Sequence, residues 1–217
     1  MFRINEIFYS LQGEGHNTGR AAIFIRFAGC NLRCPFCDTE FDSYQEMTDS
    51  DILEAIAPYP SRFIVLTGGE PTLQADESFV DLLHQNGYEV AMESNGTRPA
   101  PRNLDWLTVS PKVIRGERRE ERGERLPERD EERGERREKR EERLPDEVKV
   151  VFDGHADPDL FLSALPSHPQ PRHLYLQPCD MGDARRNAEI TAACVAYIKE
   201  HPQWRLSLQT HKLIDIK

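Results

Sequence analysis

The sequence has no apolar run that approaches the ~20 residues needed to cross a bilayer. We also expect no signal peptide, because no basic segment leads into an apolar one in MFRINEIFYSLQGEG. Three of its five cysteines are clustered, which is not typical of a secreted disulfide framework. A formal charge of −10 provides no basic face for a nucleic-acid backbone. We therefore expect a cytoplasmic protein with no membrane or nucleic-acid partner.

Residues 115–143 have almost no side chains that could be buried. The segment contains 12 basic and 12 acidic residues but one leucine, and RGERRE and ERLP each recur 18 residues later. Such a composition cannot form a core that offsets its ordering entropy, although its Glu and Arg could support a solvated helix. Because acids match bases, an arginine-rich arm for tRNA or a partner is not favoured. We expect an exposed charged insertion within a single domain that spans residues 1–217.

Outside this insertion, strand-like segments alternate with segments of helical periodicity. The predicted strands are 21–29, 62–69, 88–94, 105–110, 147–153, 172–178 and 204–210. The predicted helices are 50–59, 76–87, 157–165 and 184–201. Ser50 is the expected N-cap of the first helix, and Asn86 with Gly87 is the expected end of the second. The alternation predicts an α/β fold with a parallel sheet, open or partly closed into a barrel.

Several short polar segments each follow a predicted strand. They are the cysteine loop from Gly29, TGGEP from Thr67, ESNGT from Glu93, SPK from Ser110 and QPCD from Gln177. In parallel α/β folds, ligands bind beyond the carboxyl ends of the strands. The sequence therefore predicts that these segments surround one ligand site.

Cys30, Cys34 and Cys37 form a C-x3-C-x2-C pattern in the segment GCNLRCPFC. A structural zinc site would need four N or S ligands, and no second cysteine or histidine pair follows to complete one. Cys179 and Cys194 are isolated, and Cys194 falls on the apolar stripe of a predicted helix, where a buried thiol is common. Three thiolates suit a [4Fe–4S] cluster in which one iron lacks a protein ligand and can bind another molecule.

The cysteine pattern and TGGEP resemble the signatures of the radical S-adenosylmethionine (SAM) superfamily. More narrowly, the chain resembles the 7-carboxy-7-deazaguanine synthase family in EIFYSLQGEG, IRFAGCNLRC, FCDTEF, TGGEPTLQ, ESNGT, SPK, EVKVV, YLQPCD and HPQWRLSLQTHK. The resemblance implies a partial β/α barrel with a [4Fe–4S] cluster, SAM and Mg2+ as cofactors. It also implies conversion of 6-carboxy-5,6,7,8-tetrahydropterin to 7-carboxy-7-deazaguanine with loss of ammonia, a step of queuosine biosynthesis.

The resemblance assigns roles to individual residues. Cys30, Cys34 and Cys37 would hold the cluster, and Thr39 would bind Mg2+. The SAM-binding residues would be Phe36, Cys37, Asp38, Gly69, Ser110, Pro111, Lys112, Gln177, Pro178, Cys179 and Asp180. The substrate-binding residues would be Leu11, Gln12, Gly13, Glu14, Arg26, Thr67, His211 and Lys217, the last at a position where the family has a proline.

The chemistry of some of these residues supports their assignment. Gln12 and Glu14, on a glycine-rich loop, suit an amide-and-amine edge, and Arg26 can bind a carboxylate through two hydrogen bonds. The resemblance further implies a pterin substrate, an electron donor such as flavodoxin and a homodimer. Two alternatives remain open from the sequence: a glycyl-radical-enzyme activase of the same superfamily, and a non-catalytic iron–sulfur or zinc module.

Overall fold

The computed structural model describes residues 1–37, 39–40, 42–112, 143–155, 157–164 and 171–217. The predicted insertion at 115–143 lies outside the described residues except for Arg143, and Asp38 also lies outside them. Arg143 forms an ion pair with Asp146 (2.5 Å), directly before the next strand.

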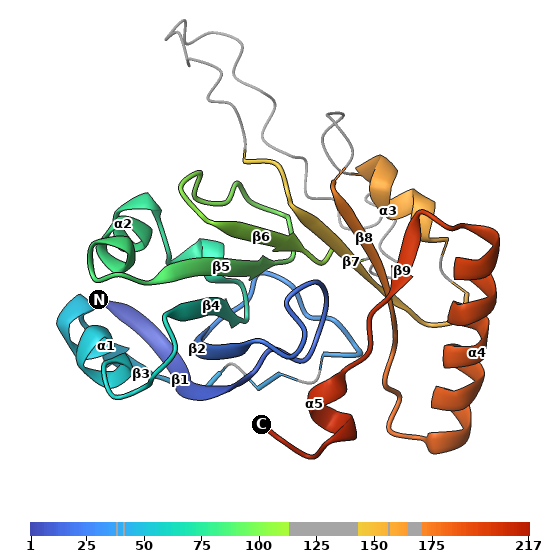
Figure 1. The fold of residues 1–217 in the computed structure, drawn as a ribbon, viewed down its shortest axis with the longest axis horizontal. Helices are drawn as coiled ribbons and strands as arrows, with labels where there is room; N and C mark the ends of the chain where they lie inside the picture. Colours follow the sequence, from blue (N-terminus) through green and yellow to red (C-terminus); the bar gives the residue numbers. More distant parts are fainter. Residues whose placement is uncertain (38, 41, 113–142, 156, 165–170) are drawn as a thin grey trace, which may run out of the picture.

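The described residues form one nine-stranded sheet in the order β3-β1-β2-β4-β5-β6-β7-β8-β9. Its strands are β1 (Phe2–Leu11), β2 (Ala21–Phe27), β3 (Gln45–Met47), β4 (Phe63–Gly68), β5 (Glu89–Ser94), β6 (Trp106–Val109), β7 (Glu147–Phe152), β8 (His173–Pro178) and β9 (Trp204–Leu206). β1 pairs antiparallel with β2 and β3, and every pair from β2 to β9 is parallel. The sheet curves without closing, so the predicted partial barrel is confirmed (Figure 1).

The helices, apart from the short last one near the C-terminus, cover the outer face of this sheet (Figure 1). They are α1 (Asp49–Ile56), α2 (Glu77–Gln85), α3 (Pro158–Ala164), α4 (Ala184–Glu200) and α5 (Thr210–Leu213), with a 3-10 turn η1 at Pro71–Leu73. Thr48, not Ser50, caps α1: its hydroxyl accepts from Asp51 N–H while the Asp51 carboxylate accepts from Thr48 N–H. This reciprocal pair satisfies two otherwise unpaired N–H groups, which explains why the N-cap lies two residues earlier than predicted.

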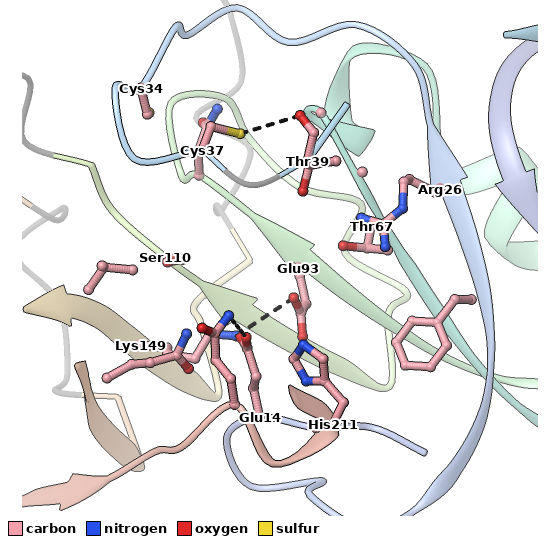
Figure 2. A pocket seen from close by; sticks show the side chains of 18 of the residues that line it. Glu14, Arg26, Cys34, Cys37, Thr39, Thr67, Glu93, Ser110, Lys149 and His211 are labelled. Atoms are coloured by element: carbon pink, nitrogen blue, oxygen red, sulfur yellow. Dashed lines mark hydrogen bonds and ion pairs between the residues drawn. The ribbon is translucent and has the colours of Figure 1, made fainter. Parts of the chain in front are cut away.

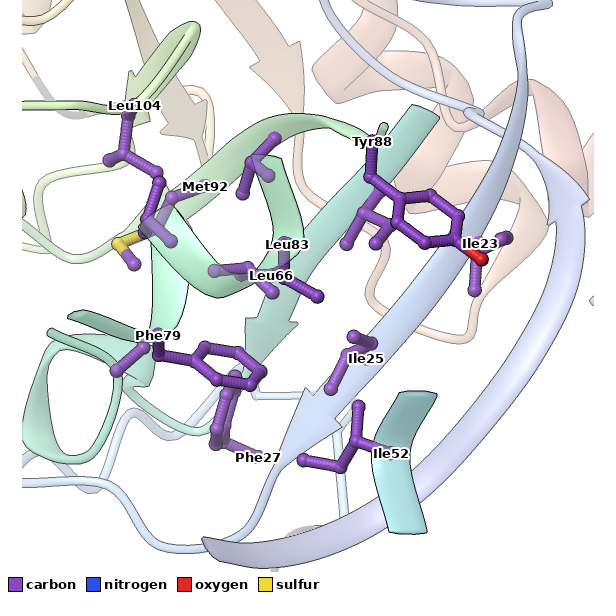
Figure 3. Close-up of a cluster of buried hydrophobic side chains, with 14 of the residues drawn as sticks. Ile23, Ile25, Phe27, Ile52, Leu66, Phe79, Leu83, Tyr88, Met92 and Leu104 are labelled. Atoms are coloured by element: carbon purple, nitrogen blue, oxygen red, sulfur yellow. The ribbon is translucent and has the colours of Figure 1, made fainter. Parts of the chain in front are cut away.

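The apolar core lies between the helices and the outer face of the strands. Ile25 and Phe27 of β2 pack there with Ile52 of α1 and Phe79 of α2 (Figure 3). A second cluster joins β7, β8 and β9 to α3 and α4, and it includes the fully buried Cys194. Burial raises the pKa of the Cys194 thiol to about 12, as expected for a core thiol and not a metal ligand.

Side chains of alternate parity on the same strands face the inside of the curved sheet. Ala22 and Phe24 of β2 belong to a separate inner cluster with Val65 of β4 and Ala91 of β5. By the two-residue period of a strand, Arg26 shares this inner face. The inner face is therefore apolar near the amino ends of the parallel strands and becomes polar toward their carboxyl ends.

Several elements differ from the sequence prediction, which contains neither β3 nor α5. Residues 2–11 form β1, to which the sequence analysis assigned no strand. The strand predicted at 204–210 has only three residues, Trp204–Leu206, and Thr210 begins α5. Thr210 also ties this end of the chain to the β1–β2 loop, since its N–H donates to Gly13 O (2.9 Å).

Candidate active site

A cavity of about 780 Å3 opens at the carboxyl ends of the parallel strands. Side chains from the β1–β2 loop, the cysteine loop, the strand ends and the C-terminal segment meet in it (Figure 2). The predicted site residues that line it are Leu11, Gln12, Gly13, Glu14, Arg26, Cys30, Cys34, Phe36, Cys37, Thr39, Thr67, Gly69, Ser110, Lys112, Gln177, Pro178, Cys179, Asp180, His211 and Lys217. Pro111 is described but does not line the cavity.

The cysteine loop follows β2 directly and forms one wall of the cavity. Cys37 N–H donates to Cys34 O (3.1 Å), and Leu32 N–H donates to Cys30 Sγ (3.4 Å). Burial raises the pKa of Cys34, the nearby Lys112 ammonium lowers it, and Cys37 and Cys30 raise it further. The three thiols are thus close enough to influence one another, and the Lys112 cation lies near them.

The glycine-rich segment after β4 packs backbone to backbone against this loop. Gly69 N–H donates to Phe27 O (3.0 Å), and Glu70 N–H donates to Gly29 O (2.9 Å). A Cβ atom on Gly69 would lie 2.0 Å from Gly29 O, and Gly68 has a φ of +122°. Only glycine permits this close approach, which fixes the position of the cysteine loop relative to β4.

A buried carboxylate, Glu70, joins the loops that follow β4 and β5. It accepts hydrogen bonds from Thr72 N–H (3.1 Å), Thr72 Oγ1 (2.6 Å), Ser94 Oγ (2.8 Å) and Asn95 N–H (2.7 Å). Asn95 in turn donates to Asn31 Oδ1 (3.0 Å) in the cysteine loop. Because these polar groups are hydrogen-bonded to one another, the network holds three loops in one arrangement.

A buried lysine organises the other end of the cavity. Lys149 of β7 pairs with Glu14 and lies 3.7 Å from Glu93 of β5. Gln12 Nε2 donates to Glu93 (2.7 Å), and Gln209 Nε2 donates to Glu14 (2.9 Å). Burial alone would raise the pKa of Glu14, but Lys149 outweighs it and lowers the pKa to about 2. Glu14 is therefore an ionised acceptor at neutral pH.

Arg26 and Lys217 converge on one carboxylate beside this network. Arg26 Nε donates to Glu6 Oε1 (2.9 Å), and Lys217 Nζ lies 2.5 Å from Glu6 Oε2. Thr67, paired with Arg26 across β2 and β4, also lines the cavity here. This side of the cavity is therefore cationic and suited to an anionic group of a ligand.

Comparison with known proteins identifies the family to which this arrangement belongs. Residues 24–115, which include all three clustered cysteines and TGGEP, match the Radical SAM superfamily model. The chain is 46% identical over 217 residues to the 7-carboxy-7-deazaguanine synthase of Bacteroides thetaiotaomicron, with 100% of both chains covered. It is 40% identical to the enzyme of that name from Bordetella pertussis, with 99% of both covered. The chain belongs to the 7-carboxy-7-deazaguanine synthase family.

A solved structure of the same family has the same fold. The crystal structure of QueE from Escherichia coli matches with a TM-score of 0.70 and 30% identity, covering 97% of this chain and 94% of that one. Membership of the radical SAM superfamily implies a [4Fe–4S] cluster and SAM. Neither the glycyl-radical-enzyme activase nor the non-catalytic module is favoured by these relatives.

The cysteine loop of this family member fits a cluster better than a single ion. No three His, Cys, Asp or Glu side chains in the described part of the chain converge on one ion position. A [4Fe–4S] cube does not require convergence, because its thiolates bind irons at separate corners. Cys30, Cys34 and Cys37 are free thiols on the cavity wall. Phe36 lies between Cys34 and Cys37 in the sequence, and Lys112 Nζ is 5.9 Å from the centroid of its ring.

Several residues of this family site escaped the sequence analysis. Glu93, Lys149, Gln209 and Glu6 line the cavity but were not assigned roles. A usable signal existed for Lys149, which interrupts the otherwise apolar core of EVKVVF with a charge. Charged residues in strands buried on both faces are rare unless paired, so such a lysine indicates a partner.

Asp180, in contrast, is held by its own loop and by the helices α4 and α5. Its carboxylate accepts from Gly182 N–H (3.0 Å), Asn187 Nδ2 (2.8 Å) and Lys212 Nζ (3.0 Å), which together hold its pKa at about 2. Within the described residues, no helix combines the length and apolar character required to cross a membrane.

Proposed function

We propose that this chain converts 6-carboxy-5,6,7,8-tetrahydropterin to 7-carboxy-7-deazaguanine with loss of ammonia, as a step of queuosine biosynthesis. The observation that carries the proposal is the cavity itself. It combines the three-cysteine loop of a radical SAM enzyme with a second, polar end, in a chain 46% identical over its full length to a 7-carboxy-7-deazaguanine synthase. When bound, the cluster supplies the electron that cleaves SAM reductively and generates the 5′-deoxyadenosyl radical.

The residues at the cysteine end suit the nucleotide. Phe36 presents a ring to the cavity beside Lys112, whose Nζ donates to Ser110 Oγ (2.7 Å). Burial lowers the pKa of Lys112, as does the charge of Lys149. The end of β8 and the residues that follow it, Gln177 to Asp180, also line the cavity. We assign SAM to the part of the cavity that these residues line, with its methionine end toward Gly69 and the cysteines.

The residues at the other end suit a reduced pterin. An ionised Glu14 and the amide of Gln12 can accept from, and donate to, the amine and amide groups along one edge of the pterin ring. Arg26, with Lys217 and Thr67 beside it, can bind the carboxylate of the substrate. The substrate then lies between Glu14 with Gln12 on one side and Arg26 with Lys217 on the other. This placement would fix the orientation in which its C6 hydrogen faces the nucleotide.

The proposal includes Mg2+ bound through Thr39. This residue lines the cavity two positions after Cys37, and Cys37 Sγ lies 3.7 Å from its carbonyl oxygen. Magnesium prefers few protein oxygens together with water and substrate oxygens, so one hydroxyl and a substrate carboxylate are suitable ligands. An electron donor such as flavodoxin and a homodimeric assembly complete the proposal.

The test is an anaerobic reaction of cluster-loaded protein with the pterin, analysed by mass spectrometry. We expect 7-carboxy-7-deazaguanine only when SAM, a chemical reductant and Mg2+ are all present. Formation of 5′-deoxyadenosine without the deazaguanine would overturn the substrate while leaving the radical chemistry in place.

Thr39→Ala should lose most of the magnesium stimulation but still cleave SAM slowly. Thr191→Ala, on α4 and outside the cavity, is the matched control and should respond to magnesium like the wild type. Undiminished magnesium stimulation in Thr39→Ala would remove Thr39 from the metal site.

A further inference from the structure

A second buried carboxylate lies beneath the polar end of the cavity without lining it. Glu147, the first residue of β7, is 2% exposed and is not part of the cavity wall. It lies two residues before Lys149, so both side chains project from the same inner face of the strand. Because this buried carboxylate does not line the cavity, it has a role other than direct contact with a ligand.

Glu147 holds the tip of the β1–β2 loop. Its Oε2 accepts a hydrogen bond from His16 N–H (2.8 Å). Gly15 packs directly on the same carboxylate: its φ is +65°, and a Cβ there would lie 2.1 Å from Glu147 Oε1. Gly15 N–H donates to Ser207 Oγ (3.0 Å), which in turn donates to Gln177 (3.0 Å). The tip is therefore fixed from β7 and from the segment after β9.

The held tip carries Glu14. Its backbone lies between Gly13 and Gly15, two residues with little intrinsic conformational restriction. Its side chain pairs with Lys149. One strand thus fixes both the backbone next to Glu14, through Glu147, and its carboxylate, through Lys149.

We propose that Glu147 is a positioning residue that fixes the β1–β2 loop, and through it Gln12 and Glu14, for binding of the pterin edge. The inference rests on the proposed function for its kinetic part and on the loop contacts alone for its structural part. Without the contact between Glu147 and His16, the β1–β2 loop would sample other conformations around Gly13 and Gly15. Glu14 would then spend less time facing the substrate.

The charges around Glu147 supply a readout that a purely structural residue would not give. Burial raises its pKa to about 7; His16 N–H and Lys149 oppose the rise, and Glu93 and Glu14 add to it. On the neighbouring strand β8, His173 is paired with Glu147 in the sheet, and its ring contacts the His16 ring. Burial and the charge of His16 lower the pKa of His173.

Ionisation of Glu147 therefore places a negative charge beside two existing carboxylates that share one lysine. Repulsion then opposes the alignment of Glu14 and Glu93 around Lys149. We expect the KM for the pterin to rise as the pH increases from about 6 to about 8 in the wild type.

The experiment compares Glu147→Ala and Glu147→Gln in the cluster-loaded protein, with Glu189→Ala on the exposed face of α4 as control. The first readout is hydrogen exchange of the peptide that covers residues 12–20. Glu147→Ala should exchange about tenfold faster there, the equivalent of one lost hydrogen bond, whereas Glu147→Gln keeps the acceptor and the protection. Wild-type protection in Glu147→Ala, or full loss in Glu147→Gln, would overturn the proposal.

The second readout is kinetic. Glu147→Ala should raise the KM for the pterin about tenfold or more while the KM for SAM stays unchanged, and Glu147→Gln should abolish the rise in pterin KM with pH. Identical pH profiles of the pterin KM in the wild type and Glu147→Gln would contradict the proposal. If Glu147→Ala does not fold, this comparison alone decides it. A wild type that does not convert the pterin would refute the proposed function instead, and hydrogen exchange would still test the loop.

Discussion

Gly69 is the position at which we expect one added methyl group to disturb SAM binding most. Alanine there would place its Cβ 2.0 Å from Gly29 O and 2.5 Å from Gly29 C, whereas ordinary contacts begin at 3.4 Å. Both neighbours are backbone atoms, so no side chain can rotate away. The cysteine loop and the end of β4 must separate by more than an ångström.

That separation removes the hydrogen bonds of Gly69 N–H to Phe27 O (3.0 Å) and of Glu70 N–H to Gly29 O (2.9 Å). Two such bonds contribute about 2 kcal/mol net. Forcing a methyl group into a packed interior costs about 1–3 kcal/mol more. The total, about 3–5 kcal/mol, is a large part of the stability of an ordinary domain.

Gly87→Ala is the matched control, because Gly87 has a φ of +80° at the end of α2 but open space around its Cβ position. It should cost only the left-handed backbone strain of about 1–2 kcal/mol. Urea unfolding of both variants, together with SAM affinity of the cluster-loaded proteins, separates the two effects. We expect Gly69→Ala to lose more stability and to bind SAM weakly, and Gly87→Ala to bind SAM like the wild type. A Gly69→Ala protein that is as stable as Gly87→Ala and keeps wild-type SAM affinity would refute the reasoning.

Three further predictions concern titratable side chains. Cys34→Ala should lose iron and cluster absorbance together while the buried Cys194→Ala keeps both; iron content near wild type in Cys34→Ala would exclude it as a ligand. Lys149→Met should destabilise the protein at pH 7 by about 3–5 kcal/mol in urea unfolding, because the Glu14 carboxylate is left buried without its cation. The stability that the lowered pKa of Glu14 provides is present above pH 4.5 and is lost as the pH falls toward about 2, so the difference between the variant and the wild type should shrink in acid. The pKa of Glu147, raised from 4.5 to about 7, provides stability that is present below 4.5 and lost as the pH rises through 7, so Glu147→Gln should gain stability relative to the wild type over this range; a constant difference would contradict the assignment.

The parts of the site that depend on local sequence were predictable. The cysteine spacing, TGGEP and the polar segments after each strand are contiguous, and parallel topology brings strand ends together whatever the register. β1 was not predictable in the same way, because five of its residues from Glu6 to Ser10 are partly buried or exposed without a clear two-residue alternation.

The pairing of Lys149 with Glu14 was also beyond sequence reasoning. The two residues are separated by 135 positions, and only the assembled sheet shows that the β1–β2 loop folds back beneath β7. A charge within a buried strand signals that a partner exists but does not identify it. The same limit applies to Glu70, whose four donors come from its own turn, from the last residue of β5 and from the loop after it.

The two ends of the cavity depend on different structural supports because the barrel is open. At the cysteine end, close backbone contact between β4 and the cysteine loop fixes the geometry, and Gly69 is its critical residue. At the polar end, no strand among the described residues joins β9 to the β3–β1 edge of the sheet, so the β1–β2 loop and the C-terminal segment form that wall instead. A loop with glycines at positions 13 and 15 cannot hold Glu14 by its own conformational preference, and it relies on Glu147, Ser207 and Thr210 for this. Since the two supports share no residue, substitutions at Gly69 and Glu147 should act on SAM and pterin affinity separately, and their effects on stability should add.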